Sequence, residues 1–168
     1  MRIMSNTKMN ELFSILLEET STYENLGELA RGKQKALVDG DTVEINRFSS
    51  MENALLKRAE KLTGLRTLLL ARLMPEEGEK KLNTLNDFIQ YHDLTRQPEW
   101  LSMKERLETA VNILKRLTYE NTMLIHTSLS LMQDLVAYCY PESGQEYALY
   151  TREGVSKTPG RTVVNYGA

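Results

Sequence analysis

Apolar residues recur at spacings of three and four through the first 140 positions, and this periodicity most constrains the fold. In that region only Pro75 and Pro98 interrupt the chain, and the Val, Ile and Thr runs typical of strands are missing from it. We therefore predict an all-α fold, an elongated antiparallel helical bundle of three long helices with one short connecting helix. Residues 1–141 would form the bundle, and residues 142–168 a flexible, irregular C-terminal tail.

Two long helices are predicted before Pro75. The first spans about residues 7–39 and ends at Gly40, because glycine suits the left-handed position after a helix. Asp41 would cap the second helix and, with Glu44, resembles a capping box. The connection is so short that the two helices should form an antiparallel hairpin. Their apolar rows comprise Met9, Leu12, Leu16, Tyr23, Leu26, Ala30 and Leu37, then Phe48, Met51, Leu55, Leu62, Leu65, Leu69 and Leu73, with polar interruptions at Glu19, Lys33 and Arg58.

The third long helix should start at Pro98, where proline's fixed φ is favourable, and run to about Tyr140. Leu82, Leu85 and Ile89 predict a short helix before it, followed by a loop over residues 93–97. Two adjacent apolar rows on the third helix are too wide for contact with one partner, so we expect it to touch more than one neighbour. These rows comprise Leu107, Ala110, Leu114, Leu117, Asn121, Leu124, Ser128, Leu131, Leu135 and Tyr138, then Val111, Thr118, Ile125, Met132 and Cys139.

Charge and composition exclude several classes of protein. The chain has 21 Lys plus Arg and 23 Asp plus Glu, a net charge of −2, which argues against nucleic acid or an anionic membrane as the main partner. No apolar run approaches the ~20 residues of a membrane-spanning helix, and the first residues lack the pattern of a secretory signal. The single cysteine, Cys139, cannot form an internal disulfide. We therefore expect a cytoplasmic protein with no nucleic-acid partner and no membrane insertion.

The sequence offers no constellation of catalytic residues. His126 is expected on the outward face of the third helix, as a solvated residue or, less consistently with its neighbours, as a phosphotransfer histidine. His92 fits a partly buried helix end, and neither histidine has the Glu three residues earlier that di-iron bundles require. Cys139 falls in an apolar row and is expected to be a buried, inert thiol. Trp100 either closes an end of the bundle or anchors a partner. We predict no enzymatic activity, no metal and no cofactor.

Three segments resemble the FlgN family of flagellar export chaperones. Residues 51–56 leading to Leu65 and Arg66 are similar to the family's Leu-Leu…Arg helix. Residues 114–124, followed by Ser128 and Leu129, are similar to its Leu…Asn…Asn…Leu…Ser-Leu region. Residues 149–154 and 160–163 match its pattern of Tyr, then Gly, then a basic-aliphatic ending. One departure is Thr118, where the first Asn of the family's pair is usual; the second is present as Asn121.

The resemblance implies a non-enzymatic, cytoplasmic chaperone of type III protein export in bacterial flagellum biogenesis. Such proteins bind the C-terminal amphipathic helices of the hook-associated proteins at the hook–filament junction, keep them unassembled and deliver them to the flagellar export gate. It implies docking of the tail on the gate's cytoplasmic domain through Tyr150, with Leu149 and Gly154. The candidates for binding the exported client are Asn121, Leu124, Ser128, Leu129, Leu131, Leu135 and Tyr138.

Two other classes of protein fit the same pattern. A structural or regulatory coiled-coil adaptor would use its apolar rows to associate with other helices. A signalling bundle would depend on His126. We expect a monomer or a weak homodimer, and a monomer with a three-helix core would disfavour the adaptor. Flanking apolar residues such as Leu56 and Leu68 could serve either the bundle's own core or a client groove.

Overall fold

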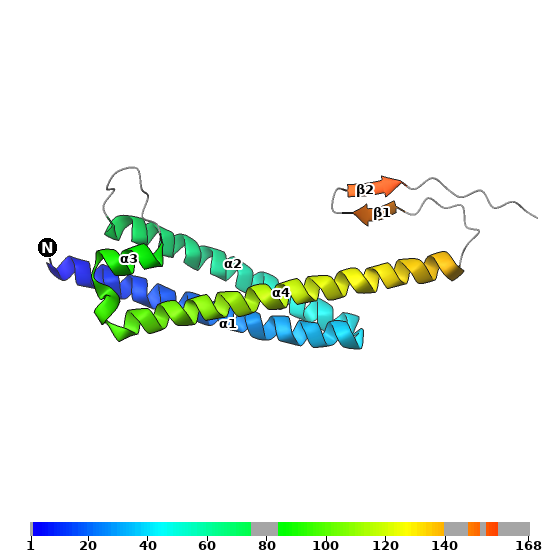
Figure 1. The fold of residues 1–168 in the computed structure, drawn as a ribbon, viewed down its shortest axis with the longest axis horizontal. Helices are drawn as coiled ribbons and strands as arrows, with labels where there is room; N and C mark the ends of the chain where they lie inside the picture. Colours follow the sequence, from blue (N-terminus) through cyan, green and yellow to red (C-terminus); the bar gives the residue numbers. More distant parts are fainter. Residues whose placement is uncertain (1, 75–83, 140–147, 152–153, 158–168) are drawn as a thin grey trace, which may run out of the picture. The chain divides into compact units, whose positions relative to one another are not determined.

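The structure, a computed structural model, describes residues 2–74, 84–139, 148–151 and 154–157, with side chains described between residues 7 and 139 of these ranges. The elements in chain order are α1 (Arg2–Asp39), α2 (Thr42–Leu73), α3 (Leu85–Tyr91), the 3-10 turn η1 (Leu94–Arg96), α4 (Pro98–Cys139), β1 (Ala148–Thr151) and β2 (Gly154–Lys157) (Figure 1). The chain divides into two compact units, Met1–Ile125 and His126–Ala168, and α4 contributes to both.

The prediction of three long helices and one short helix is confirmed. The first helix begins at Arg2, earlier than the predicted residue 7. The predicted loop over residues 93–97 contains the turn η1, in which Leu94 is buried against the core. Leu82 and the predicted domain boundary between residues 141 and 142 lie outside the described residues.

A short turn joins α1 to α2. Gly40 has φ +70°, the left-handed conformation that glycine adopts without strain, and the Asp41 amide donates to the Ala36 carbonyl at 2.9 Å. The Asp41 carboxylate caps α2 by accepting from the amides of Val43 and Glu44 at 3.1 and 3.0 Å. The predicted capping box is incomplete, because the Asp41 amide is already bonded and the Glu44 carboxylate pairs with a nearby arginine.

The core of the first unit is centred on the start of α4. Trp100 closes this end of the bundle, which is one of the two roles predicted for it. Its ring centroid lies 5.0 Å from that of Phe13 and 5.4 Å from that of Phe88. His92 is half-buried at the end of α3, as predicted, with Nε2 3.3 Å from the Leu73 carbonyl oxygen. The buried cluster contains Leu12, Leu16, Leu69, Leu70, Met74, Leu85, Phe88, Ile89, Leu94, Trp100, Met103 and Leu107.

Polar contacts show that α4 runs parallel to α1 and therefore antiparallel to α2. Arg106 donates to Glu24 at 2.7 and 2.6 Å, and further along both helices Asn121 Nδ2 donates to the Ala30 carbonyl at 2.8 Å. The hydrogen bonds from Arg106, together with its charge, hold the pKa of the Glu24 carboxyl below its ordinary value. Because α4 also packs on α3 through Trp100, the prediction that it touches more than one neighbour is confirmed.

Glu19 interrupts the apolar row of α1 and is nevertheless completely buried. Thr63 donates to its Oε1 at 2.7 Å, and the Tyr23 hydroxyl donates to the same oxygen at 3.4 Å. Arg66 Nε lies 3.4 Å from Oε2, although neither atom makes a hydrogen bond within the part of the chain that the structure describes. Glu19 therefore belongs to a polar network between α1 and α2. We call it the Glu19 network; its residues are Glu19, Tyr23, Thr63 and Arg66.

The predicted apolar row of α2 is only partly buried. Leu62 and Leu69 of that row are buried as predicted, whereas Met51 and Leu65 are exposed. Ala59 and Leu70, which lie outside the row, complete the buried side of α2. A row repeated every seven residues drifts by about 20° per heptad around an α-helix, so part of it turns away from α1. The remaining polar interruptions pair across the hairpin, Lys33 with Glu52 and Arg58 with Glu18, both at 2.8 Å.

Two short strands correct the expectation of an irregular tail. β1 and β2 pair antiparallel, with Leu149 opposite Ser156, Tyr150 opposite Val155 and Thr151 opposite Gly154. Only two residues separate the strands, a length that favours a tight hairpin. The sequence did not predict it because each strand has only four residues and no Asn-Gly or Asp-Gly pair marks the turn.

Candidate functional site

The second half of α4 has a wide apolar surface in solvent. From His126 to Cys139 every residue is exposed, and the exposed fraction of the large apolar side chains runs from 42% for Val136 to 86% for Tyr138. At about 100° per residue these side chains occupy about half of the helix circumference. We call this surface the α4 apolar face; its residues are Leu129, Leu131, Met132, Leu135, Val136 and Tyr138.

The sequence-predicted client residues fall in two places. Ser128, Leu129, Leu131, Leu135 and Tyr138 lie in the second unit, and the four apolar ones belong to the α4 apolar face. Asn121 and Leu124 lie in the first unit, where Leu124 is half-buried and Asn121 is almost completely buried.

The expectation of a buried Cys139 is wrong, because the thiol is exposed. The apolar row that contains it continues into the second unit, and within the described residues of that unit no other helix is present to cover it. His126 is exposed, as predicted.

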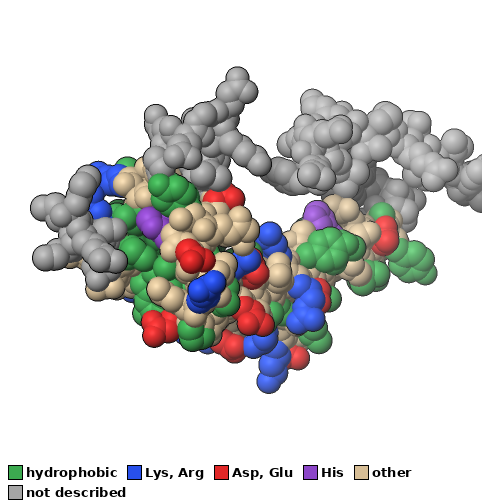
Figure 2. Space-filling view, turned by 60° about the vertical axis from the view of Figure 1, so that its left-hand side comes forward, with side chains coloured by type: hydrophobic (Ala, Val, Ile, Leu, Met, Phe, Trp, Pro, Cys, Tyr) green, Lys and Arg blue, Asp and Glu red, His purple; other side chains and the backbone are tan. Residues whose placement is uncertain are grey.

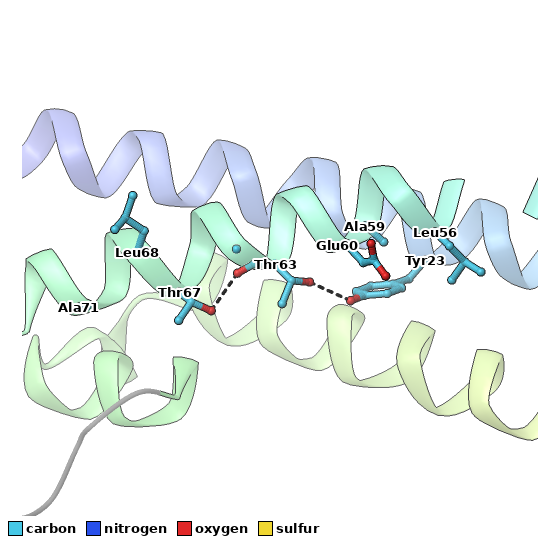
Figure 3. A pocket seen from close by; sticks show the side chains of 9 residues that line it. Tyr23, Leu56, Ala59, Glu60, Thr63, Thr67, Leu68 and Ala71 are labelled. Carbon is cyan, nitrogen blue, oxygen red and sulfur yellow. Dashed lines mark hydrogen bonds between the residues drawn. The ribbon is translucent and has the colours of Figure 1, made fainter. Parts of the chain in front are cut away.

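A large open hollow lies along α2 in the first unit (Figure 3). Its volume is about 740 Å³, and the Tyr23 ring projects into it from α1, with the hydroxyl 3.2 Å from the Thr63 hydroxyl. The wall from α2 extends from Leu56 to Ala71, about 22 Å at 1.5 Å per residue. Most side chains of that wall are small or apolar: Leu56, Ala59, Thr63, Gly64, Thr67, Leu68 and Ala71.

A second, smaller hollow of about 180 Å³ lies where α1, α2 and α4 of the first unit meet. Leu56 lines both hollows, so the two adjoin. The ion pair between Lys33 and Glu52 lies in the lining of the second hollow, and so does Asn121. Asn121 Nδ2 is bonded to Ala30, whereas its buried Oδ1 has no hydrogen-bond partner among the described residues.

The tail residues predicted to dock on the export gate lie in the hairpin. Leu149 and Tyr150 are in β1, and Gly154 is the first residue of β2. The hairpin therefore brings the backbone of Tyr150 next to that of Val155, and Gly154 next to Thr151.

Comparison with protein families decides the identity of the chain. The family described as FlgN protein matches residues 4–158, nearly the whole sequence. The chain belongs to the FlgN family. FlgN proteins are flagellar export chaperones that bind flagellar proteins, and they are not known as enzymes. Comparisons with curated proteins and with solved structures gave no match.

Three further observations concern charge, membrane-spanning segments and metal ligands in the part of the chain that the structure describes. On the face shown in Figure 2, acidic and basic side chains are interspersed, without a broad region of one sign. The helices described in the structure include none that is long and apolar enough to cross a bilayer. Among the same described residues, no group of three or more His, Cys, Asp or Glu side chains could hold a metal ion.

The small-residue wall of α2 is the part of the surface that sequence reasoning missed. Leu56 and Leu68 stood out as spare apolar positions, but Gly64 and Ala71 did not. With Ala59, Thr63 and Thr67 they form a series separated by four, one, three and four positions, and this recurrence was the available signal. That signal is weak by itself, because small residues also occur where two helices of one chain pack closely.

Proposed function

We propose that this FlgN-family protein is a cytoplasmic export chaperone for the flagellar hook-associated proteins. It binds their C-terminal amphipathic helices and delivers them to the flagellar type III export gate. The family supports the general role, and the α4 apolar face is the observation that supports helix binding by this chain.

The exposure of the α4 apolar face supports a partner that covers it. Its side chains retain between 42% and 86% of their accessible surface. Covering an apolar side chain with this exposure contributes about 1 kcal/mol, so burying all six side chains of the face offsets a large part of the entropy that association costs. An amphipathic client helix has the complementary apolar side, and that side would otherwise drive its premature polymerisation. Shielding and recognition would then use the same contact.

A titration with client peptides tests this proposal. Peptides from the C-termini of the hook-associated proteins should bind saturably, whereas a peptide from the filament protein's C-terminus should not. Leu131→Asp and Leu135→Asp should each weaken binding at least about tenfold, because they place a charge in a contact that must be dry. Gln133→Asp adds the same charge on the polar side of α4 and serves as the matched control.

All three positions are exposed in the structure, so circular dichroism should show unchanged helix content. Absence of binding by the folded wild-type protein at tens of micromolar would contradict the chaperone proposal. Equal losses for Gln133→Asp and the leucine variants would show that net charge, rather than the apolar face, controls the interaction.

Docking on the export gate is a separable part of the proposal. It assigns Tyr150, with Leu149 and Gly154, to contact with the gate's cytoplasmic domain. An isolated two-stranded hairpin is only marginally stable in water, so a partner that covers it would stabilise it considerably. Tyr150→Ala should reduce gate binding and leave client-peptide binding intact. A parallel loss of both activities would make Tyr150 a folding residue.

A coiled-coil adaptor remains the alternative, because the α4 apolar face could equally pair with the same face of a second copy. Sedimentation of the free protein separates the two functions. A monomer, or a dimer that client peptide dissociates, agrees with a chaperone; a stable dimer that ignores the peptide agrees with an adaptor.

A further inference from the structure

Two unpaired apolar surfaces of this chain match each other in length. The α4 apolar face is a helical surface of large side chains in solvent, and from Leu129 to Tyr138 it is about 14 Å long. The larger hollow of the first unit is an open apolar surface along α2, and its α2 wall is about 22 Å long (Figure 3). The hollow is therefore long enough to take the whole apolar face of one α4 helix.

Side-chain size favours contact between the face and the hollow over contact between two like surfaces. The α2 wall is small and exposed at Gly64, Thr67 and Ala71, and a Cβ atom built at Gly64 meets no atom within 4 Å. Large side chains such as Leu131 and Leu135 can insert into such a wall, because helices pack by placing the ridges of one in the grooves of the other. Two α4 faces would instead set large side chains against large ones, and two α2 walls would leave space between them.

The charges of the two segments are also complementary. In the part of α4 that carries the apolar face, Asp134 is the only charged side chain. The α2 segment from Leu56 to Ala71 has four basic side chains and one acidic side chain. Two of the basic side chains face glutamates of α1, which leaves an excess of one positive charge from Lys57, Lys61 and Glu60. Contact between the face and the hollow therefore brings opposite charges together, whereas contact between two faces brings like charges together.

The buried area favours a dimer in which this contact is made twice. A leucine-sized side chain covers roughly 100 Å² when it is fully buried, and the side chains of the α4 apolar face retain on average more than half of their surface. Together with an equal area of the hollow they bury about 700 Å² in one contact, which is below the ~1,000 Å² of a specific interface. Two such contacts bury about 1,400 Å², an area typical of stable complexes.

We propose that the larger hollow binds a second copy of this chain, whose α4 apolar face packs against the α2 wall. A two-fold axis makes the same contact twice, with the face of each copy in the hollow of the other, and so closes the assembly at two chains. The dimer follows from the two surfaces and does not depend on the chaperone function. Its role rests on the function proposed above: the dimer covers the apolar face in the absence of a client, and a client helix displaces one copy to bind there.

Two variants, measured separately and mixed, test the contact. Gly64→Leu fills the hollow and replaces glycine with a better helix former, and Leu135→Asp places a charge in the apolar face. In sedimentation equilibrium of the full chain the wild type should dimerise, and each variant should weaken the dimer at least about tenfold. Mixing the two variants should restore association in part, because the intact face of Gly64→Leu can still occupy the intact hollow of Leu135→Asp. Pairing of two α4 faces would not respond to Gly64→Leu.

Ser50→Leu and Gln133→Asp are the matched controls. The first adds a leucine to an exposed position of α2 outside the hollow, and the second adds a charge to an exposed position of α4 outside the apolar face. Both should dimerise like the wild type. Circular dichroism should show unchanged helix content in all four variants.

Cross-linking through Cys139 tests the same contact without filling the hollow. This cysteine is exposed and follows the last residue of the α4 apolar face. Leu56→Cys and Ala71→Cys mark the two ends of the α2 wall, and each is combined with Cys139→Ser and mixed with the wild-type chain. A short bismaleimide should join Cys139 of one copy to one of these two ends in the other copy, as peptide mass spectrometry identifies. Met51→Cys, at an exposed position of α2 outside the lining of the hollow, should give no link.

The outcomes separate this inference from the chaperone function. A wild type that stays monomeric, a Gly64→Leu variant that dimerises normally, or a mixture no stronger than its components overturns the dimer. A link to Met51→Cys in place of the two ends overturns the docking site, and association beyond two chains overturns the closed arrangement. Client-peptide binding by a monomeric wild type would leave the chaperone function standing without the dimer. A dimer with the expected properties and no peptide binding would support the inference and contradict the function.

Discussion

Replacing Arg66 with Met tests whether the Glu19 network holds α1 and α2 together. Glu19 is completely buried, and Arg66, whose side chain is 24% exposed, is its only cationic neighbour at an ion-pair distance in the described residues. Arg66→Met leaves a buried carboxylate whose Oε1 still accepts from Thr63 and Tyr23 but whose Oε2 has no partner. We expect this to lower the free energy of unfolding by about 3 kcal/mol, the lower end for a broken buried pair.

The lower end is chosen because the contact is loose. Arg66 Nε lies 3.4 Å from Oε2 without a hydrogen bond between them. For a unit of this size, a loss of 3 kcal/mol lowers the melting temperature by about 10 °C. Urea unfolding followed by circular dichroism at pH 7 measures the free energy directly. Combining Arg66→Met with Glu19→Leu should restore stability to within about 1 kcal/mol of the wild type, because the apolar pair needs no desolvated charge.

Arg58→Met is the matched control, because Arg58 lies on the same helix as Arg66 but is exposed and forms its salt bridge with Glu18 of α1 at the surface. Such surface pairs contribute less than about 1 kcal/mol. If Arg66→Met costs no more than Arg58→Met, the buried carboxylate does not depend on Arg66. A double variant as unstable as Arg66→Met alone would refute the same reasoning, because the loss could not then come from an unpaired charge.

Further predictions concern three single residues: Asp41, Glu24 and Cys139. Asp41→Ala removes the cap of α2 and should cost about 1 kcal/mol in urea unfolding, whereas Asp41→Asn should cost much less. Glu24→Gln should cost less than about 1 kcal/mol at pH 7, because the pair with Arg106 is largely exposed. The pKa of Glu24 is lowered in the folded state, so the pair stabilises the fold above pH 4.5, the ordinary pKa of a glutamate. This stabilisation should be lost as the pH falls through the lowered pKa of the folded protein, and unfolding measured at decreasing pH checks it. Cys139 should react completely with a thiol reagent in the native protein, and protection until denaturant is added would contradict its exposure.

The helical architecture could be predicted from the sequence because its signals are local. Apolar spacing defined the long helices, and Gly40, Asp41 and Pro98 marked ends that depend on neighbouring backbone groups alone. The hairpin of β1 and β2 escaped prediction because four-residue strands give too little periodicity. The FlgN resemblance was likewise carried by residue types and order, and the family match confirms it.

The candidate surfaces depended on the tertiary structure. Periodicity identifies an apolar row on a helix, but it does not show how far other helices cover that row. Cys139 was therefore predicted to be buried, although it is exposed. The sequence likewise showed Glu19 as a defect in a row, because Thr63, which donates to its carboxylate, and Arg66, which lies at an ion-pair distance from it, are 44 and 47 positions away.

By itself, then, the sequence determined the helices, their order and the family, since these follow from short-range backbone preferences and from residue identity. Only the tertiary structure decided which apolar residues are covered, that Glu19 has partners and that Asn121 Oδ1 has none among the described residues. These outcomes depend on how helices distant in the chain are rotated against one another, and a rotation of a fraction of a turn exchanges a buried position for an exposed one.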